Sequence, residues 1–298
     1  MSRAFSQYLA ERFPVGAYLV LIGAMVAAAS ASASAATGAV VVLNWAQGLG
    51  TITLLLGFFV LRVFDEHKDY DRDLVAHPDR VLSRGLITLA DLRRAGIAAV
   101  AVQLVLTVPF GVPGLLWLLA YLAFAVAMRF EFGVGRWLNQ HLVLYAITHN
   151  PIVALMMAYA VVISGGIVVL EGPVLWWLLT ASCTSLGFEV GRKLRAPADE
   201  REAQDTYTQA LGIPRAVAFL IGVEVLSVAA AWPLLATPWG QVVLALAALV
   251  MLGGPMRFYL SPTPGAAKLA ENTSTLGALV IYIVVVADTA ARLGVVWS

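Results

Sequence analysis

The sequence predicts an all-α integral membrane protein, with transmembrane helices bundled around a central cavity under a polar cap. Three observations lead to this fold class. Of the 298 residues, 60% are hydrophobic and only 12% are charged, whereas soluble domains carry about 25% charged residues. The mean hydropathy is +0.84. The charge is also concentrated, because segments 62–94 and 189–215 hold 24 of the 37 Lys, Arg, Asp and Glu residues.

A helix that crosses a bilayer needs about 20 mostly apolar residues. Nine such stretches occur, at residues 15–36, 39–61, 92–111, 114–130, 141–163, 172–188, 214–233, 239–256 and 274–296. Most connections between them are short and contain Gly or Pro, and the two charged segments are the long exceptions. We therefore expect one domain over residues 1–298, with nine transmembrane helices and a cap formed by residues 62–94 and 189–215.

The first apolar stretch resembles a secretory signal, because Arg3 and Arg12 precede it and small residues at 29–36 close it. Signal peptides share this order of basic, apolar and small residues. Since eight further apolar stretches follow, we interpret it as an uncleaved first transmembrane helix.

The distribution of basic residues predicts the orientation in the membrane, because cytoplasmic loops are enriched in Lys and Arg. With the N-terminus in the cytoplasm, 18 of the 19 Lys and Arg residues fall on the cytoplasmic side, and only Arg292 does not. We expect a protein of a bacterial inner membrane with both charged segments on its cytoplasmic face and its C-terminus outside. No basic tract points to nucleic acid, and the single Cys183 excludes an internal disulfide or a Cys-based metal cluster.

An acidic stripe follows the second apolar stretch, because Asp65, Asp69 and Asp73 recur at every fourth position. On an α-helix this spacing places the three carboxylates on one face. Like charges so placed repel by about 0.2–0.5 kcal/mol per pair, which favours a bound cation. Mg²⁺ suits such a site, since it takes one or two carboxylates together with substrate phosphates. The alternative is a solvated loop of alternating charge, because basic residues are interleaved at positions 62, 68, 72 and 80.

The stripe is part of a longer pattern, Asp65-x3-Asp69-x3-Asp73 followed by His77-Pro78-x-Arg80-x-Leu82-x-x-Gly85. This pattern resembles the first aspartate-rich motif of the UbiA superfamily of intramembrane prenyltransferases. The family pattern is Asn-x3-Asp-x3-Asp followed by Arg-Pro-Leu-x-x-Gly. Here Asp65 replaces the usual Asn, which keeps an oxygen ligand and adds charge, and Val81 replaces the usual Pro.

The second motif of that family, Asp-x3-Asp followed by a Thr, is matched less well in segment 189–215. In one alignment Asp199 and Thr206 fit the spacing, but Arg195 occupies the place of the first Asp. Glu200 and Glu202 lie near enough to compensate for the missing acid.

In another alignment Glu189-x3-Lys193 matches the second motif, with a base replacing the second acid. Both alignments depart from a symmetric two-metal arrangement.

The resemblance implies transfer of an isoprenyl group from a prenyl diphosphate to an acceptor, with Mg²⁺ as the cofactor and membrane lipid around the reaction. The acceptor stays unidentified at this point. The resemblance assigns catalysis and metal binding to Asp65, Asp69, Asp73 and Asp199, and diphosphate binding to Arg80, Glu189, Arg192 and Lys193.

The sequence His149-Asn150-Pro151 interrupts the fifth apolar stretch. Ionisable residues inside a membrane are functional candidates, so Tyr145, His149 and Asn150 are candidates for the cavity wall and the acceptor site. The alternative is a kink at Pro151 whose freed backbone groups are satisfied locally.

Other polar or aromatic residues in the apolar stretches have less specific interpretations. Cation–π contact with a carbocation or anchoring at the membrane surface would explain the aromatic residues Tyr121, Phe130, Phe132, Trp137 and Tyr145. Asn44 and Gln47 are expected inside the second helix, bonding to a neighbouring helix. Glu224 and Asp288 are each expected to pair with a polar group or to line a polar cavity.

Two alternative functions fit the same pattern. One is a terpene cyclase of the same superfamily, in which no acceptor takes part, and the degenerate second motif motivates it. The other is a non-enzymatic transporter or lipid-binding protein that uses the acidic stripe as a cation site.

Overall fold

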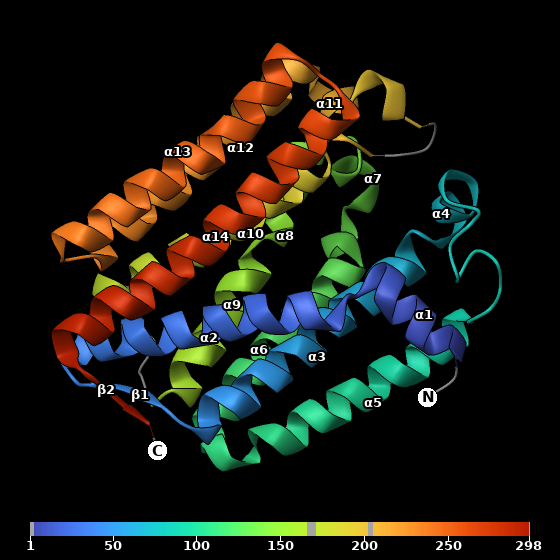
Figure 1. Ribbon diagram of the computed structural model, residues 1–298. Coiled ribbons are helices and arrows are strands. Elements are labelled where there is room, and N and C mark those ends of the chain that lie inside the picture. The colour runs from blue at the N-terminus through green and yellow to red at the C-terminus, as the bar shows by residue number, and fades with distance from the viewer. Residues whose placement is uncertain (1–2, 166–170, 202–204, 298) are drawn as a thin grey trace.

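Long apolar helices lie side by side in a bundle in the computed structural model, which describes residues 3–165, 171–201 and 205–297 (Figure 1). The helices are α1 Arg3–Arg12, α2 Val15–Thr37, α3 Trp45–Lys68, α4 Tyr70–Ala76, α5 Leu89–Thr107, α6 Gly111–Arg129, α7 Gly135–Leu138, α8 Leu142–His149, α9 Pro151–Ile163, α10 Gly172–Arg192, α11 Tyr207–Leu211, α12 Ile213–Ala231, α13 Pro238–Leu260 and α14 Pro264–Leu293. The strands are β1 Val41–Leu43 and β2 Val295–Trp297.

Eight stretches of the described residues are long and apolar enough to cross a membrane. One of them, Leu89–Arg129, contains both α5 and α6, which are separated by a turn at Val108–Phe110, and α6 begins at Gly111 with φ +61°. The two helices pack against each other beyond this turn (Figure 1). With α8 and α9 taken as one broken helix, the described residues thus contain approximately the nine passages that hydropathy predicted, and the all-α membrane fold is confirmed.

The start of the second passage differs from the prediction. The stretch expected to begin its helix at residue 39 first forms β1, which pairs in parallel with β2. Asn44 is the N-cap of α3, since its side chain accepts from the Ala46 N–H at 2.9 Å and the Gln47 side chain accepts from the Asn44 N–H at 2.8 Å. The expectation that Asn44 lies within the helix is therefore wrong. Gln47 does reach the neighbouring α2, where its Nε2 donates to Ser30 Oγ at 3.2 Å.

The fifth passage is broken where the sequence predicted a kink. α8 ends at His149, Asn150 links the two pieces, and Pro151 is the first residue of α9. Proline cannot donate a backbone hydrogen bond and its ring clashes with the preceding turn, so the helix is interrupted before it.

Helices extend into both cap segments, which were predicted as loops. α3 continues to Lys68, α4 follows it, and α5 already begins at Leu89, behind a capping box between Thr88 and Asp91. α10 continues to Arg192, and α14 begins ten residues earlier than expected, at Pro264. Hydropathy underestimates these helices because their ends carry polar and charged residues.

The N-terminal helix α1, which was not predicted, packs against the polar end of α3. Tyr8 and Phe13 are buried, and the rings of Phe13 and Phe59 meet edge to face at 5.6 Å. Arg12 Nε lies 2.7 Å from Glu66 Oε1. This packing brings a basic side chain from the start of the chain to the cap.

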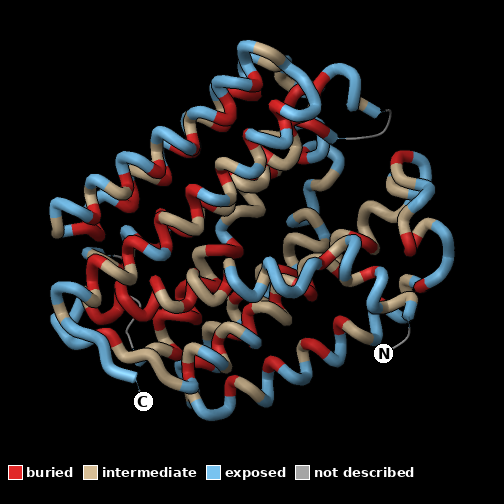
Figure 2. Tube along the Cα trace, viewed as in Figure 1, coloured by how far each residue is buried: buried red, intermediate tan, exposed pale blue. Residues whose placement is uncertain are grey.

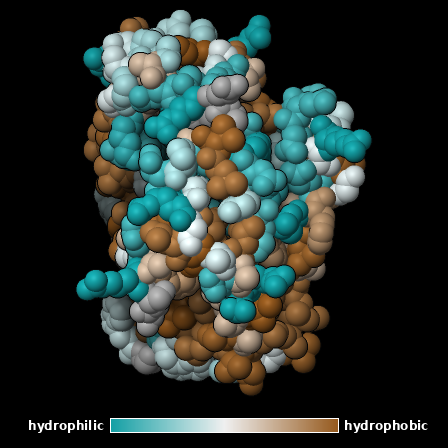
Figure 3. All heavy atoms as spheres, turned by 90° about the vertical axis from the view of Figure 1, so that its right-hand side faces the viewer, coloured by the Kyte–Doolittle hydropathy of each residue, from teal (hydrophilic) through white to brown (hydrophobic). Residues whose placement is uncertain are grey.

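Buried residues line the inner faces of the helices, while exposed residues lie on their outer faces (Figure 2). Many of the exposed residues are large and apolar, including Val105, Leu249 and Leu260, as expected for helices in contact with lipid. The end that carries α1 and α4 differs, because hydrophilic side chains gather over much of it, with apolar patches between and beside them (Figure 3). β1 and β2 lie at the opposite end (Figure 1).

Two buried acids within the helices have partners, as the sequence predicted. Asp288 accepts hydrogen bonds from the Ala236 and Thr237 N–H groups and lies 2.9 Å from Arg292 Nε. Glu224 Oε1 accepts from Ser274 Oγ at 2.6 Å. The carboxylate of Asp288 thereby joins α14 to the turn before α13.

Candidate functional site

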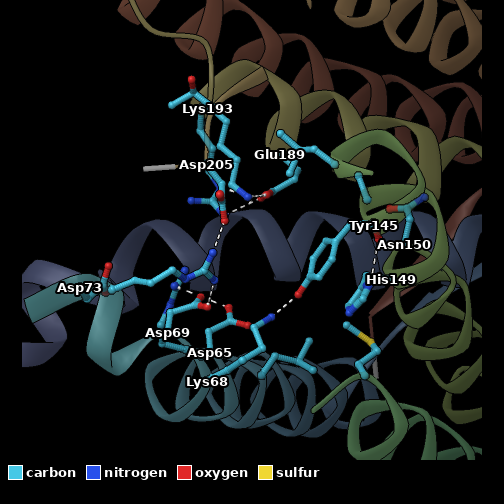
Figure 4. A pocket seen from close by; sticks show the side chains of 18 of the residues that line it. Asp65, Lys68, Asp69, Asp73, Tyr145, His149, Asn150, Glu189, Lys193 and Asp205 are labelled. Atoms are coloured by element: carbon cyan, nitrogen blue, oxygen red, sulfur yellow. Dashed lines mark hydrogen bonds and ion pairs between the residues drawn. The ribbon is translucent and has the colours of Figure 1, made fainter. Parts of the chain in front are cut away.

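A cavity of about 370 Å³ opens at the polar end of the bundle, within the range of about 300–1,000 Å³ typical of ligand sites. Side chains from α3, α4, α8, α9 and α10, and from the segments that follow α4 and α10, line it (Figure 4). It brings together ten of the eleven predicted site residues: Asp65, Asp69, Asp73, Arg80, Tyr145, His149, Asn150, Glu189, Arg192 and Lys193. Helices of the two halves of the chain thus meet at one site.

Asp65, Asp69 and Asp73 share one wall of the cavity, although they do not share one continuous helix as predicted. α3 ends at Lys68, and Asp69, with φ −96° and ψ 5°, separates it from α4. The stripe persists because Asp69 N donates to Asp65 O at 2.8 Å and Asp73 N donates to Asp69 O at 2.9 Å. These four-residue steps keep helical spacing through the break.

Each of the three aspartates has an arginine partner. Asp73 is paired with Arg80 at 2.5 Å, and Asp69 is paired with Arg72. Asp65 has the longest contact, 3.7 Å to Arg62, and its side chain is 46% exposed. Asp65 is therefore the carboxylate of the stripe that is most available to a further ligand.

The opposite wall is formed by the end of α10, where Glu189 is saturated by basic neighbours. Its Oε2 lies 2.6 Å from Arg192 Nη2, and its Oε1 lies 3.0 Å from Lys193 Nζ. Lys193 stands four residues after Glu189, the place where the family motif has its second acid. This wall therefore presents ammonium and guanidinium groups to the cavity.

Asp199, which was expected to act in catalysis and metal binding, is not among the described residues that line the cavity. It ends a short 3-10 turn, Pro197–Asp199. The neighbouring Glu200 accepts hydrogen bonds from Thr206 Oγ1 at 2.9 Å and from Thr208 Oγ1 at 2.5 Å. Glu200 thus organises the loop, and Glu202 lies outside the described residues.

Asp205 also lines the cavity from the second charged segment, and motif spacing did not single it out. Arg72 contacts both Asp205 and Asp69, and so joins the two cap segments (Figure 4). No local signal separates Asp205 from Asp199, because both lie in the same polar loop and only the path of that loop distinguishes them.

The cavity carries more basic than acidic side chains, since eight Lys and Arg residues and five Asp and Glu residues line it. Sequence reasoning missed the basic residues Arg12, Arg62, Lys68, Arg72 and Arg195 as members of the site. Burial, and then the nearby Arg80, hold the pKa of His77 below its ordinary value. The excess positive charge suits a polyanionic ligand.

The inner part of the cavity is aromatic and apolar. The rings of Tyr145 and His149 stack at 3.9 Å with an interplanar angle of 12°, and Lys68 contacts the Tyr145 hydroxyl (Figure 4). Phe58, Met128, Ile152 and Val153 are among the apolar residues that line the cavity.

Of the five aromatic residues proposed as lining, Tyr145 alone lines the cavity among the described residues. Tyr121 is buried elsewhere and bonds to Gln103, while Phe130 is 70% exposed. Phe132 is 37% exposed, and its ring meets that of His149 edge to face at 5.4 Å.

The donor set fits one Mg²⁺ better than two. Among the described residues, no three His, Cys, Asp or Glu side chains converge closely enough to hold a metal ion by themselves. Mg²⁺ needs only one or two carboxylates when phosphates complete its shell, and Asp65 and Asp69 on the first wall are the residues that would supply them. The second wall does not fit a metal ion, because Lys193 and Arg192 already occupy both oxygens of Glu189.

A bundle of this shape, with its cavity between two charged cap segments, has the fold of the UbiA homologues, as the first motif predicted. A UbiA homologue from Aeropyrum pernix K1 superposes with a TM-score of 0.66 at 17% identity, over 92% of this chain and 98% of that one. A structure of digeranylgeranylglyceryl phosphate synthase superposes with a TM-score of 0.65 at 14% identity, over 97% and 100%. No protein-family model and no curated protein sequence matches the chain.

Proposed function

We propose that this integral membrane protein is a Mg²⁺-dependent prenyltransferase, which moves an isoprenyl group from a prenyl diphosphate to an acceptor. The observation that carries the proposal is the composition of the cavity, in which the first-motif aspartates face Arg192 and Lys193 while an apolar wall lies behind them. A prenyl diphosphate has the matching shape, because a compact polyanionic head is joined to a long hydrocarbon chain. The fold of the two UbiA homologues supports the same reaction class.

In this proposal Asp65 and Asp69 hold Mg²⁺, with Asp73 completing the acidic wall. When bound, the ion supplies neutralisation of the charge that develops on the leaving diphosphate. Arg192, Lys193 and Arg80 donate hydrogen bonds to the phosphate oxygens, and charge-assisted bonds of this kind are about twice as strong as neutral ones.

The apolar wall receives the isoprenyl chain. The bond between its C1 carbon and the diphosphate oxygen breaks, and both electrons leave with the diphosphate. Phe58, Ile152 and Val153 exclude water from the allylic cation, and the Tyr145 ring contributes cation–π stabilisation of about 0.5–2 kcal/mol. A nucleophilic atom of the acceptor then forms the new bond to C1.

The test uses purified protein in lipid nanodiscs with geranylgeranyl diphosphate and Mg²⁺, and measures pyrophosphate release. Asp69→Asn removes a charge from the acidic wall and should slow release by about 10²–10³-fold, because metal-mediated charge stabilisation is worth several kcal/mol. The matched control is Asp71→Asn, since Asp71 lies two residues after Asp69, at the start of α4, but is exposed and does not line the cavity.

Equal activity of the two variants would contradict the assignment of the aspartate wall. Absence of pyrophosphate release from the unaltered protein would contradict the proposal that it is a prenyltransferase and would favour a transporter or lipid-binding protein. A cyclic product in the absence of any acceptor would favour a terpene cyclase.

A further inference from the structure

His149 is held in one orientation and in one tautomer. Its Nδ1 lies 2.8 Å from the backbone carbonyl oxygen of Tyr145. A carbonyl oxygen only accepts hydrogen bonds, so Nδ1 carries the hydrogen. A neutral imidazole has one such hydrogen, and Nε2 is therefore the nitrogen with the free lone pair. Stacking on the Tyr145 ring and the edge contact of Phe132 fix the ring plane.

The free nitrogen lies within the cavity wall without a partner. Nε2 of His149 is buried, and no hydrogen-bond partner for it exists among the described residues. His149 is a lining residue of the cavity (Figure 4). Buried polar atoms are nearly always hydrogen-bonded, so a lone pair left free in a cavity wall points to a ligand that donates a hydrogen bond.

His149 also lies where the charged and apolar parts of the cavity meet. Tyr145, one helical turn before it, contacts Lys68 on the charged wall, next to the aspartates (Figure 4). Ile152 and Val153, one turn after it, belong to the apolar wall. A prenyl diphosphate with its head on the charged wall and its chain along the apolar wall places its C1 carbon near this junction.

We propose that Nε2 of His149 is the base that accepts the proton of the acceptor, and that the acceptor reacts through a hydroxyl group carried on an apolar body. This inference rests on the proposed function. The hydroxyl oxygen forms the bond to C1, the bond from C1 to the diphosphate breaks with its electron pair leaving on the diphosphate, and the hydroxyl proton moves to Nε2. The resulting imidazolium returns the proton to water after the product leaves.

The chain provides an internal control for this residue. His141 makes the same local bond, with Nδ1 2.8 Å from the Trp137 carbonyl oxygen, but it is exposed and does not line the cavity. The two histidines therefore share a tautomer and differ in burial, because Nε2 of His149 is buried in a residue that lines the cavity, whereas His141 is exposed.

The activity test compares His149→Gln with His141→Gln in nanodiscs, with geranylgeranyl diphosphate and Mg²⁺. The acceptor probe is 4-propylphenol, and its methyl ether serves as the matched compound without a hydroxyl proton. We expect His149→Gln to lower transfer to the phenol by about 10²-fold, the lower end of what a general base contributes. His141→Gln should transfer the geranylgeranyl group to the phenol at the rate of the unaltered protein. The methyl ether should give no prenylated product.

Equal transfer by His149→Gln and the unaltered protein would overturn the role of His149, while pyrophosphate release would still stand as evidence for the proposed function. If the unaltered protein releases no pyrophosphate, that result would instead contradict the proposed prenyltransferase function.

A second measurement needs neither turnover nor a folded variant with full activity. In ¹⁵N-histidine NMR of the unaltered protein, the signal absent from His149→Gln should show a protonated Nδ1 and a bare Nε2. Addition of 4-propylphenol should shift this signal and leave that of His141 unchanged. The proposal would be overturned by a protonated Nε2, or by a His149 signal that does not shift when 4-propylphenol is added to protein with bound prenyl diphosphate.

Discussion

The two walls of the cavity come from equivalent parts of the chain, yet they carry opposite chemistry. Each is formed where a transmembrane helix, α3 or α10, ends in a charged segment. On the first wall three aspartates face the cavity, and Asp65 keeps a loosely paired carboxylate. On the second wall Glu189 is fully paired, so that Arg192 and Lys193 determine its charge.

This difference between the walls indicates how a diphosphate can be held with one metal ion instead of two. A metal ion and a protein cation both neutralise phosphate oxygens, but a protein cation is present before the substrate arrives. When Glu189-x3-Lys193 is aligned with the second motif, Lys193 takes the place of an acid. The difference between the two walls therefore predicts one metal ion bound on the first wall, opposite the fixed cations Arg192 and Lys193 on the second wall.

Metal removal should have the largest effect. Chelation with EDTA is expected to lower pyrophosphate release by about 10²–10³-fold, and Mg²⁺ should restore it. Electron paramagnetic resonance with Mn²⁺ and prenyl diphosphate should count one bound ion per protein. Two bound ions would contradict the proposed difference between the walls, because the second wall would then also hold a metal ion.

Replacement of the fixed cation should have an intermediate effect. Lys193→Gln is expected to weaken binding of prenyl diphosphate about 10-fold or more, since hydrogen bonds to charged groups are worth about 1.5–3 kcal/mol. Lys268→Gln is the control, because this exposed lysine pairs with Glu271 outside the cavity.

Lys193→Asp sharpens the same comparison, since it restores an acid four residues after Glu189. A second Mn²⁺ ion should then bind.

In the binding experiment, equal affinity of Lys193→Gln and Lys268→Gln for prenyl diphosphate would contradict the role of the second wall.

Removal of the neutralising acid should have the smallest effect, and in the opposite direction. Glu189→Gln releases Arg192 and Lys193 from their carboxylate partner, so prenyl diphosphate should bind about 5-fold more tightly at low Mg²⁺. This change corresponds to about 1 kcal/mol, the interaction of unit charges about 4 Å apart in water. Titration calorimetry would measure it, with Glu271→Gln as control; weaker binding would show that Glu189 positions the two cations.

Prediction from the sequence was most accurate where the signal is local. The apolar stretches identified the passages, the four-residue step identified Asp65, Asp69 and Asp73 as one wall, and Pro151 identified the break beside His149. Each of these features depends on residues within a few turns of each other.

Prediction was less accurate where the outcome depends on distant contacts. Asp199 matched the motif spacing, but the path of its loop brings Asp205 to the cavity instead, where Arg72 contacts it. The basic residues interleaved with the aspartates suggested a solvated loop, yet Lys68 and Arg72 line the cavity as part of the site.

The sequence by itself determined that the chain crosses a membrane many times and where its acids and bases are concentrated, because helix length and hydropathy are properties of neighbouring residues. Only the tertiary structure decided which charges face each other, and it also brought Arg12 of α1 to the cavity and left Nε2 of His149 free. These outcomes depend on packing between helices far apart in the chain, and no short stretch of sequence encodes that packing.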